Sequence, residues 1–266
     1  MTGVTRVNGT SGDKTHLPTM VGAAALAIVF TVVFHESIHA LVALSIGAEV
    51  RRFSSLFVDT LTTASWQARI IAGSASIANL WAALVLWLVL RGARQGSLTG
   101  RWFLWLLMLE NGLSGAGYWM FSGAAGAGDW ADVIQGWPGT DAWRIGMFVV
   151  GSILFMFVVW QALREMGKIA APAPGPAAVS WLTANAVIAL AGLFSPYGFG
   201  SLPVTAGLAA SLFALSPLLW MMMWMKARMF PKIVTDRLVI RRSWPLVGVA
   251  AAAVVVFSVV LGVVHG

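Results

Sequence analysis

Apolar residues run in long uninterrupted segments along this chain, without the strict alternation that is typical of half-buried strands. A helix needs about 20 predominantly apolar residues to cross a bilayer. Pro18 falls in the first turn of the first segment, where a helix tolerates proline, and Gly47 is a suitable C-terminal stop. We therefore predict an all-α fold, a polytopic transmembrane helical bundle without a sizeable soluble domain. The seven predicted spans are 18–47, 68–90, 102–122, 143–163, 177–195, 203–225 and 244–264.

Composition and charge support a multi-pass integral membrane protein with the lipid bilayer as its surroundings. Hydrophobic residues make up 59% of the chain and charged residues 10%, against about 25% charged in an ordinary soluble domain. The net charge of +7 could suggest a nucleic-acid partner, but its placement between the spans does not. With a cytoplasmic N-terminus, thirteen of the 17 Lys and Arg residues lie on the inner side, as the positive-inside tendency predicts. The C-terminus is then external.

The first predicted span contains the motif HESIH, in which His35 and His39 are four residues apart and Glu36 follows the first histidine. On a helix the two rings project from one face and can bind one metal ion. Glu36 is then displaced around the helix, where it can act as a general base on a metal-activated water. A structural polar cluster is the plainer alternative. Histidines and carboxylates inside an apolar span are nevertheless functional candidates by default, and this pattern predicts a zinc site.

A catalytic zinc ion usually has a third protein ligand and one open position. There is no cysteine, and the other two histidines lie near the chain ends, so a carboxylate is the better source. Asp129 follows a glycine-rich stretch after the third predicted span, and such a turn could carry it back toward the metal. Glu110, inside that span, is the alternative third ligand. The weaker candidates are Asp59 and Asp132.

The motif and its surroundings resemble the site-2 protease family of intramembrane zinc metallopeptidases. The resemblance rests on FHESIHAL at 34–41, GAEV at 47–50 and AGSASIAN at 72–79. It implies that Asn79 helps to hold the substrate near the zinc, and that Asp129 is the third ligand. We extend the substrate-binding expectation to Asn111 in the third span.

The resemblance covers roughly residues 18–132, and several family features differ in this chain. The aspartate follows a glycine and precedes a tryptophan, where the family usually has Leu-Asp-Gly, and there is no inserted PDZ-like domain. Family members usually open the site toward the cytoplasm, whereas the charge distribution places His35 and His39 nearer the outer face. We treat 1–266 as a single transmembrane domain with a polar tail at 1–17, a zinc-protease core at 18–132 and additional helices at 133–266.

The predicted function is that of a zinc metalloendopeptidase whose substrate is a transmembrane or membrane-bound peptide. One alternative is a metal-binding membrane protein without hydrolytic activity, such as a zinc transporter or sensor. Transporters usually place ionisable groups on several spans along a route, whereas the polar residues here concentrate in the first and third spans. Another alternative is an inactive protease-like scaffold. The intact Glu36 argues against it, because a scaffold has no need of the general base.

Overall fold

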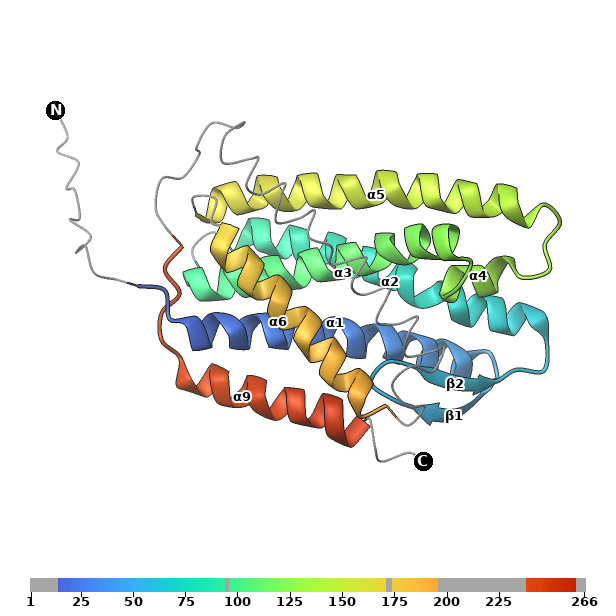
Figure 1. The fold of residues 1–266 in the computed structure, drawn as a ribbon, viewed down its shortest axis with the longest axis horizontal. Coiled ribbons are helices and arrows are strands. Elements are labelled where there is room, and N and C mark those ends of the chain that lie inside the picture. The colour runs from blue at the N-terminus through green and yellow to red at the C-terminus, as the bar shows by residue number, and fades with distance from the viewer. Residues whose placement is uncertain (1–13, 94–95, 171–173, 196–237, 262–266) are drawn as a thin grey trace.

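The computed structural model describes residues 14–93, 96–170, 174–195 and 238–261, and these form an elongated bundle of helices (Figure 1). Described in chain order, the elements are α1 (Leu17–Ser45), β1 (Glu49–Phe53), β2 (Val58–Leu61), α2 (Ser65–Gly92), α3 (Leu98–Ala125), α4 (Asp129–Ile134), α5 (Thr140–Ile169), α6 (Pro174–Leu193), α9 (Trp244–Val255) and the π-helical turn η1 (Val256–Val260). The prediction of a mostly helical chain is confirmed.

Four of these helices, α1, α2, α5 and α6, are long and apolar enough to cross a membrane. Helix α3 is also 28 residues long and occupies the third predicted span, but it is not among these four. It carries polar residues in its middle and packs against α1, α2 and α5. The predicted span at 203–225 lies outside the described residues. The last predicted span begins as predicted at Trp244, and its final residues also lie outside the described part.

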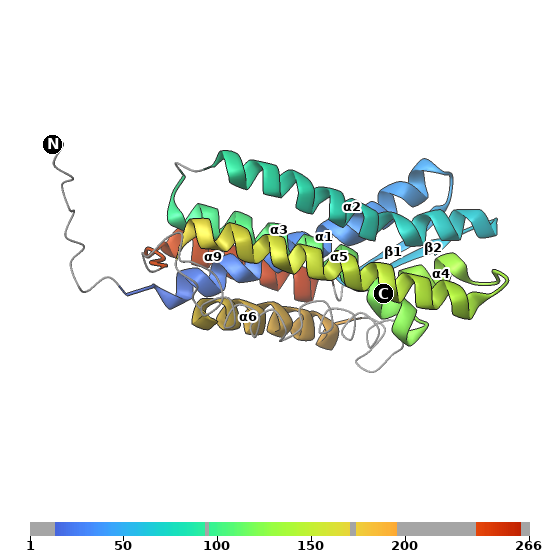
Figure 2. The same ribbon diagram turned by 90° about the horizontal axis from the view of Figure 1, so that it is seen from above.

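Helix α1 lies inside the bundle, in contact with α2, α3, α6 and α9 (Figures 1 and 2). Pro18 occupies its first turn, and the chain leaves the helix through Gly47, whose φ of 75° favours glycine. Small residues allow the close approach of α9. A Cβ atom added to Gly22 would lie 3.0 Å from the side chain of Leu246 and 3.3 Å from that of Ala250. This packing buries most of the first half of α1.

A short antiparallel hairpin, β1–β2, follows α1 and was not predicted from the sequence, which treats this stretch as a loop. Its turn is closed by Ser54, whose backbone N–H and hydroxyl both donate to the Phe57 carbonyl, at 3.0 and 2.7 Å. Ala48 and Val50 pack with Ile71 and the end of α1 in a small apolar cluster. The hairpin is thereby fixed beside the C-terminal end of α1.

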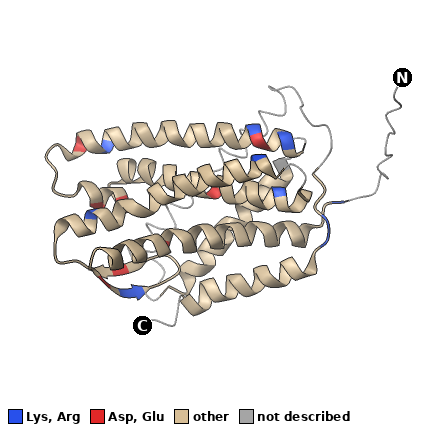
Figure 3. Cartoon of the chain, turned by 180° about the vertical axis from the view of Figure 1, so that it is seen from behind, with Lys and Arg blue, Asp and Glu red and all other residues tan. Residues whose placement is uncertain are grey.

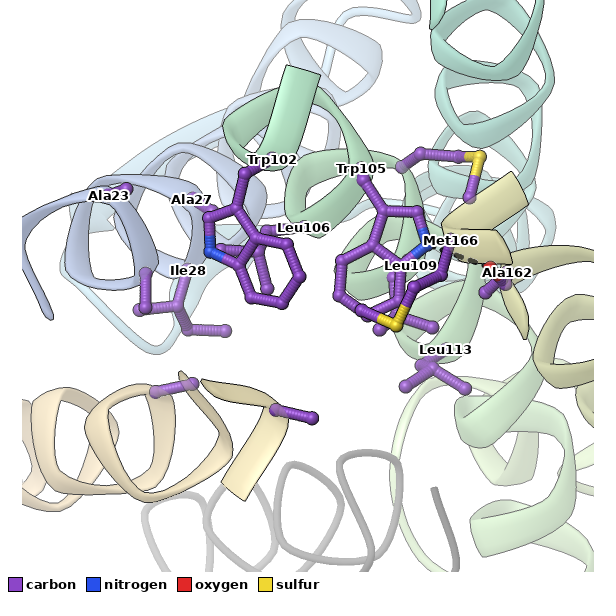
Figure 4. Close-up of a cluster of buried hydrophobic side chains, with 14 of the residues drawn as sticks. Ala23, Ala27, Ile28, Trp102, Trp105, Leu106, Leu109, Leu113, Ala162 and Met166 are labelled. Carbon is purple, nitrogen blue, oxygen red and sulfur yellow. Dashed lines mark hydrogen bonds between the residues drawn. The ribbon is translucent and has the colours of Figure 1, made fainter. Parts of the chain in front are cut away.

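Helices α3 and α5 pack along much of their length, and glycines set their separation. A Cβ atom at Gly123 would lie 2.6 Å from the Arg144 carbonyl oxygen, and one at Gly151 would lie 2.5 Å from the Met120 nitrogen. Small residues permit such close helix contacts in membrane proteins. Near the other end of α3 two buried indoles stack, Trp102 and Trp105, and Trp105 Nε1 donates to the Ala162 carbonyl at 2.8 Å (Figure 4).

Helices α1 and α9 begin at the same end of the bundle. The His16 N–H donates to the Ile240 carbonyl at 2.9 Å, and the Ser243 N–H donates to Thr19 Oγ1 at 2.9 Å. The charged residues gather toward the two ends of the bundle and leave its middle largely uncharged (Figure 3). The end where α1 begins also holds Arg101, which donates to the Lys168 carbonyl. The opposite end holds the hairpin and α4 (Figure 1).

Candidate metal centre

Helix α1 presents three polar side chains at successive turns, Thr31, His35 and His39, and all three are buried. The four-residue spacing places them in one row along an otherwise apolar helix. The two imidazole rings meet edge to face, with centroids 4.9 Å apart, and their Nε2 atoms are 3.3 Å apart. The local helix geometry alone therefore brings two nitrogen ligands together.

The third group is Asp129, the first residue of α4. Helix α3 ends at Ala125, and the turn that follows contains Gly126 and Gly128, with φ values of 66° and 85°. Both values lie in the region that favours glycine. Arg144 of α5 donates to the Gly123 and Ala124 carbonyls at 3.2 and 3.0 Å, which satisfies the end of α3. The turn thus carries the carboxylate back onto α1.

The three groups form a nearly equilateral triangle of ligand atoms. Asp129 Oδ2 lies 3.2 Å from His35 Nε2 and 3.4 Å from His39 Nε2. A tetrahedral ion with ligand bonds of about 2.0–2.1 Å separates its ligand atoms by roughly 3.3–3.4 Å. The observed separations therefore match one face of such a tetrahedron. Among the described residues, this is the group of side chains that could hold a metal ion.

The charge pattern inside the triangle also calls for a cation. His39 Nδ1 lies 2.8 Å from the Ile71 carbonyl, which can only accept a hydrogen bond, so Nδ1 carries a proton. When this ring is neutral, its lone pair is therefore on Nε2, which faces the triangle. Asp129 Oδ2 is buried without a hydrogen-bond donor among the described groups. One added proton can bridge two of these three acceptors, whereas a metal ion satisfies all three together.

Asp129 itself is suited to hold a cation. Burial works against ionisation of its carboxyl group, but the adjacent His39 and His35, when charged, outweigh this effect and hold its pKa well below its usual range. In its ionised form the carboxylate contributes one negative charge to the centre.

Helix α2 supports the centre with three residues of the AGSASIAN segment. A Cβ atom at Gly73 would lie 3.3 Å from the Val133 side chain, so the glycine allows α4 to pack closely. Ser76 Oγ accepts a 2.6 Å hydrogen bond from the Trp130 indole, next to Asp129. Asn79 Oδ1 lies 2.7 Å from His35 Nδ1. These three residues are spaced three apart, so they lie on one side of α2, the side that faces the centre.

Glu36 is also buried, with 5% of its surface exposed. It forms no hydrogen bond or ion pair with another described residue, although it lies close enough to His35, His39 and Asp129 to interact electrostatically with them. A buried carboxylate without a partner is costly. Its position beside the triangle leaves it available to a water molecule there.

The remaining candidates lie apart from the triangle. Glu110 is buried on α3 with its Oε2 unpaired, and it is not a member of the metal-binding group. Asp59 belongs to strand β2, and Asp132 lies one turn after Asp129 in α4. His16 precedes α1 at the far end and pairs with Thr19 at 2.7 Å. His265, the remaining histidine, lies outside the described residues.

The two asparagines expected to bind substrate are both buried and face each other. Asn79 is fully buried and Asn111 is 3% exposed. Asn79 Nδ2 donates to Asn111 Oδ1 at 2.8 Å, and Asn111 Nδ2 donates to Thr31 Oγ1 at 3.0 Å and to the Leu107 carbonyl at 2.8 Å. Their amides lie behind His35, where they contact one another and the helices.

Sequence inspection did not single out four residues that lie around the site: Thr31, Ser76, Tyr118 and Trp130. The Tyr118 ring stacks on His35, with centroids 4.7 Å apart and planes 25° apart. A signal was present for two of them. Thr31 lies four residues before His35, and Ser76 lies three before Asn79, so each extends a polar row along an apolar helix. Tyr118 and Trp130 meet the site only through tertiary packing.

No protein-family model, curated protein or solved structure matches the chain.

Proposed function

We propose that this protein is an intramembrane zinc metallopeptidase that hydrolyses peptide bonds of membrane-bound substrates. The observation that carries the proposal is the triangle of His35 Nε2, His39 Nε2 and Asp129 Oδ2, with sides of 3.2–3.4 Å. The free, buried Glu36 beside it supplies the group that a hydrolase needs in addition to a metal.

The donor set favours zinc among the common metal ions. Two imidazole nitrogens and one carboxylate oxygen are typical of catalytic zinc sites, which keep a fourth position open. Magnesium and calcium prefer sets made of oxygen ligands. The Ile71 carbonyl and Asn79 amide that contact the outer ring nitrogens resemble the outer partners that orient zinc-binding histidines.

When bound, zinc would act as a Lewis acid that polarises the substrate carbonyl and makes a nearby water more acidic. Glu36 then accepts a proton from water as the water oxygen attacks the carbonyl carbon. As the C–N bond breaks, Glu36 delivers that proton to the leaving nitrogen, and a carboxylic acid and an amine result. His35, His39 and Asp129 would hold the ion throughout the reaction.

The depth of the centre supports a membrane-embedded substrate. His39 lies six residues before the end of α1, or roughly 9 Å along the helix axis, and His35 lies a turn deeper. Helices that are apolar enough to span a membrane, α1 and α2, provide two sides of the site. A peptide bond would reach it from within the bilayer or at its surface.

A non-hydrolytic metal protein is the competing possibility. A transporter would be expected to offer further clusters of ionisable groups along a route. In the described ranges, His35, His39 and Asp129 are the single group with metal-binding geometry. This favours a fixed centre, and the unpaired Glu36 beside it favours hydrolysis.

The test is cleavage of a labelled transmembrane peptide in proteoliposomes by purified protein, with wild type and Glu36→Gln compared at equal zinc content. The amide cannot accept the proton, so we expect a loss of about 100- to 10,000-fold with zinc retained. Equal cleavage by the two proteins would refute the mechanism. Stoichiometric zinc with no cleavage by wild type of any membrane peptide in a library would favour the non-hydrolytic alternative.

A further inference from the structure

We infer that Asn79 and Asn111 are positioning residues, which together hold the His35 ring with Nδ1 protonated and the Nε2 lone pair aimed at the metal centre. The inference rests on the proposed zinc function. It gives Asn79 a task that differs from the substrate contact implied by the family resemblance.

The chain of hydrogen bonds begins at a group whose polarity is fixed. The Leu107 carbonyl can only accept a hydrogen bond, and the side-chain nitrogen of Asn111, Nδ2, donates to it at 2.8 Å. The reversed amide would place Oδ1 against that carbonyl oxygen without a hydrogen between them. Thr31 Oγ1, 3.0 Å from the same nitrogen, can serve as a second acceptor. The orientation of Asn111 is therefore set by the backbone of α3.

The next link passes that orientation to helix α2. With its nitrogen turned toward Leu107, Asn111 directs Oδ1 at Asn79, 2.8 Å away. An amide oxygen accepts only, so Asn79 must approach it with Nδ2. Both side chains are buried, so bulk water cannot provide alternative partners for either amide.

The last link sets the protonation of His35. Because Nδ2 of Asn79 faces Asn111, its Oδ1 faces His35 Nδ1 at 2.7 Å. An oxygen acceptor at that distance requires a proton on Nδ1, and the neutral ring then has its lone pair on Nε2. His39 reaches the same state directly, through the Ile71 carbonyl. The two ligands are thus oriented differently. A backbone carbonyl orients His39, and two hydrogen-bonded asparagines on α2 and α3 orient His35.

The experiment measures zinc affinity of the purified full-length chain in detergent by competition with a chromophoric chelator. Asn79→Leu removes the acceptor of the His35 Nδ1 proton. Asn111→Leu removes the group that orients Asn79, at a position two hydrogen bonds away from His35. We expect each to weaken zinc binding about 10- to 100-fold, as removal of outer partners of metal ligands usually does. Thermal unfolding checks that each variant is folded.

Two further variants separate positioning from other roles. Asn79→Asp still accepts from His35 Nδ1 through a carboxylate oxygen, so it should bind zinc much more tightly than Asn79→Leu. Thr31→Val is the matched control within the same cluster. It removes the second acceptor of Asn111 while the Leu107 carbonyl remains, and it should bind zinc within about threefold of wild type.

A spectroscopic readout reports the ring directly. In protein labelled with ¹⁵N-histidine and loaded with zinc, His35 should show a protonated Nδ1 that is lost or altered in Asn111→Leu and retained in Thr31→Val. Zinc affinity of Asn111→Leu and Asn79→Leu equal to wild type would overturn the inference while leaving the proposed function standing. Failure of wild type to bind zinc would overturn both. A substrate role for Asn79 would instead raise KM in Asn79→Leu and Asn79→Asp alike, with zinc affinity unchanged.

Discussion

Asp129 Oδ2 lies 3.2 Å from His35 Nε2, although one residue opens the short helix α4 and the other lies deep in α1. The contact joins α1 to α4, two elements that lie far apart in the 18–132 segment. It depends on a glycine turn, on the packing of α4 against α2 and on the burial of both side chains.

We expect one zinc ion per chain, held by His35 and His39 together with a carboxylate. Elemental analysis of purified protein should find stoichiometric zinc in wild type and little in His35→Ala or His39→Ala. His16→Ala is the matched control, because His16 lies at the other end of α1 and bonds to Thr19. Zinc at 100 times its Kd should stabilise the wild type by about 2.7 kcal/mol, and a chelator should reverse that gain. Equal zinc in all four proteins would refute the site.

Asp129→Ala should lower zinc occupancy and peptide cleavage together, because it removes the anion from the triangle. Glu110→Gln should leave zinc bound, since Glu110 is buried on α3 away from the metal-binding group. Both quantities are to be measured on the same preparations. The reverse result, with zinc lost from the Glu110 variant and kept by the Asp129 variant, would transfer the third ligand to Glu110.

The hydrogen bond from Trp130 to Ser76 should anchor α4 and with it Asp129. Trp130→Phe and Ser76→Ala should each reduce stability by about 1 kcal/mol and weaken zinc binding, and the double variant should lose little more than either single one. Trp119→Phe is the control, because the Trp119 ring packs against Trp130, tilted by 46° with ring centroids 4.1 Å apart, but its Nε1 has no hydrogen-bond partner among the described groups. Additive losses in the double variant would show that the bond does not act as a unit.

The distribution of basic residues predicts that the N-terminus is cytoplasmic and that the metal centre lies toward the external face. The chain has no cysteine, so single cysteines can be placed without further changes. A membrane-impermeant thiol reagent should label Arg51→Cys in the hairpin of intact cells. It should label Lys14→Cys, at the end where α1 begins, only after lysis. The opposite pattern would turn the site toward the cytoplasm, as in the family that the motif resembles.

Much of the local structure follows from the sequence because it depends on contacts over a few residues. The length of the apolar segments predicts helices that overlap those observed in the described part of the chain, with starts within four residues, although α5 ends at Ile169, beyond the predicted 163. The four-residue spacing of His35 and His39 places both rings on one face of a helix whatever surrounds it. Gly47 likewise ends α1 through its backbone freedom. The hairpin is not predicted in this way, because two short strands at a helix end show little alternation of apolar and polar residues.

The rest of the centre required the tertiary structure, because it joins residues that no periodicity relates. From the sequence, Asp129 and Glu110 were both open as the third ligand, and the structure brings Asp129 to the histidines because glycine backbones permit the turn after α3 and Trp130 packs against α2. Asn79 and Asn111 were expected to face a substrate, yet their partners are decided by how α2 and α3 approach α1. Sequence spacing determines which side chains share one face of a helix. Only the packing of the helices determines which residues of other elements contact that face.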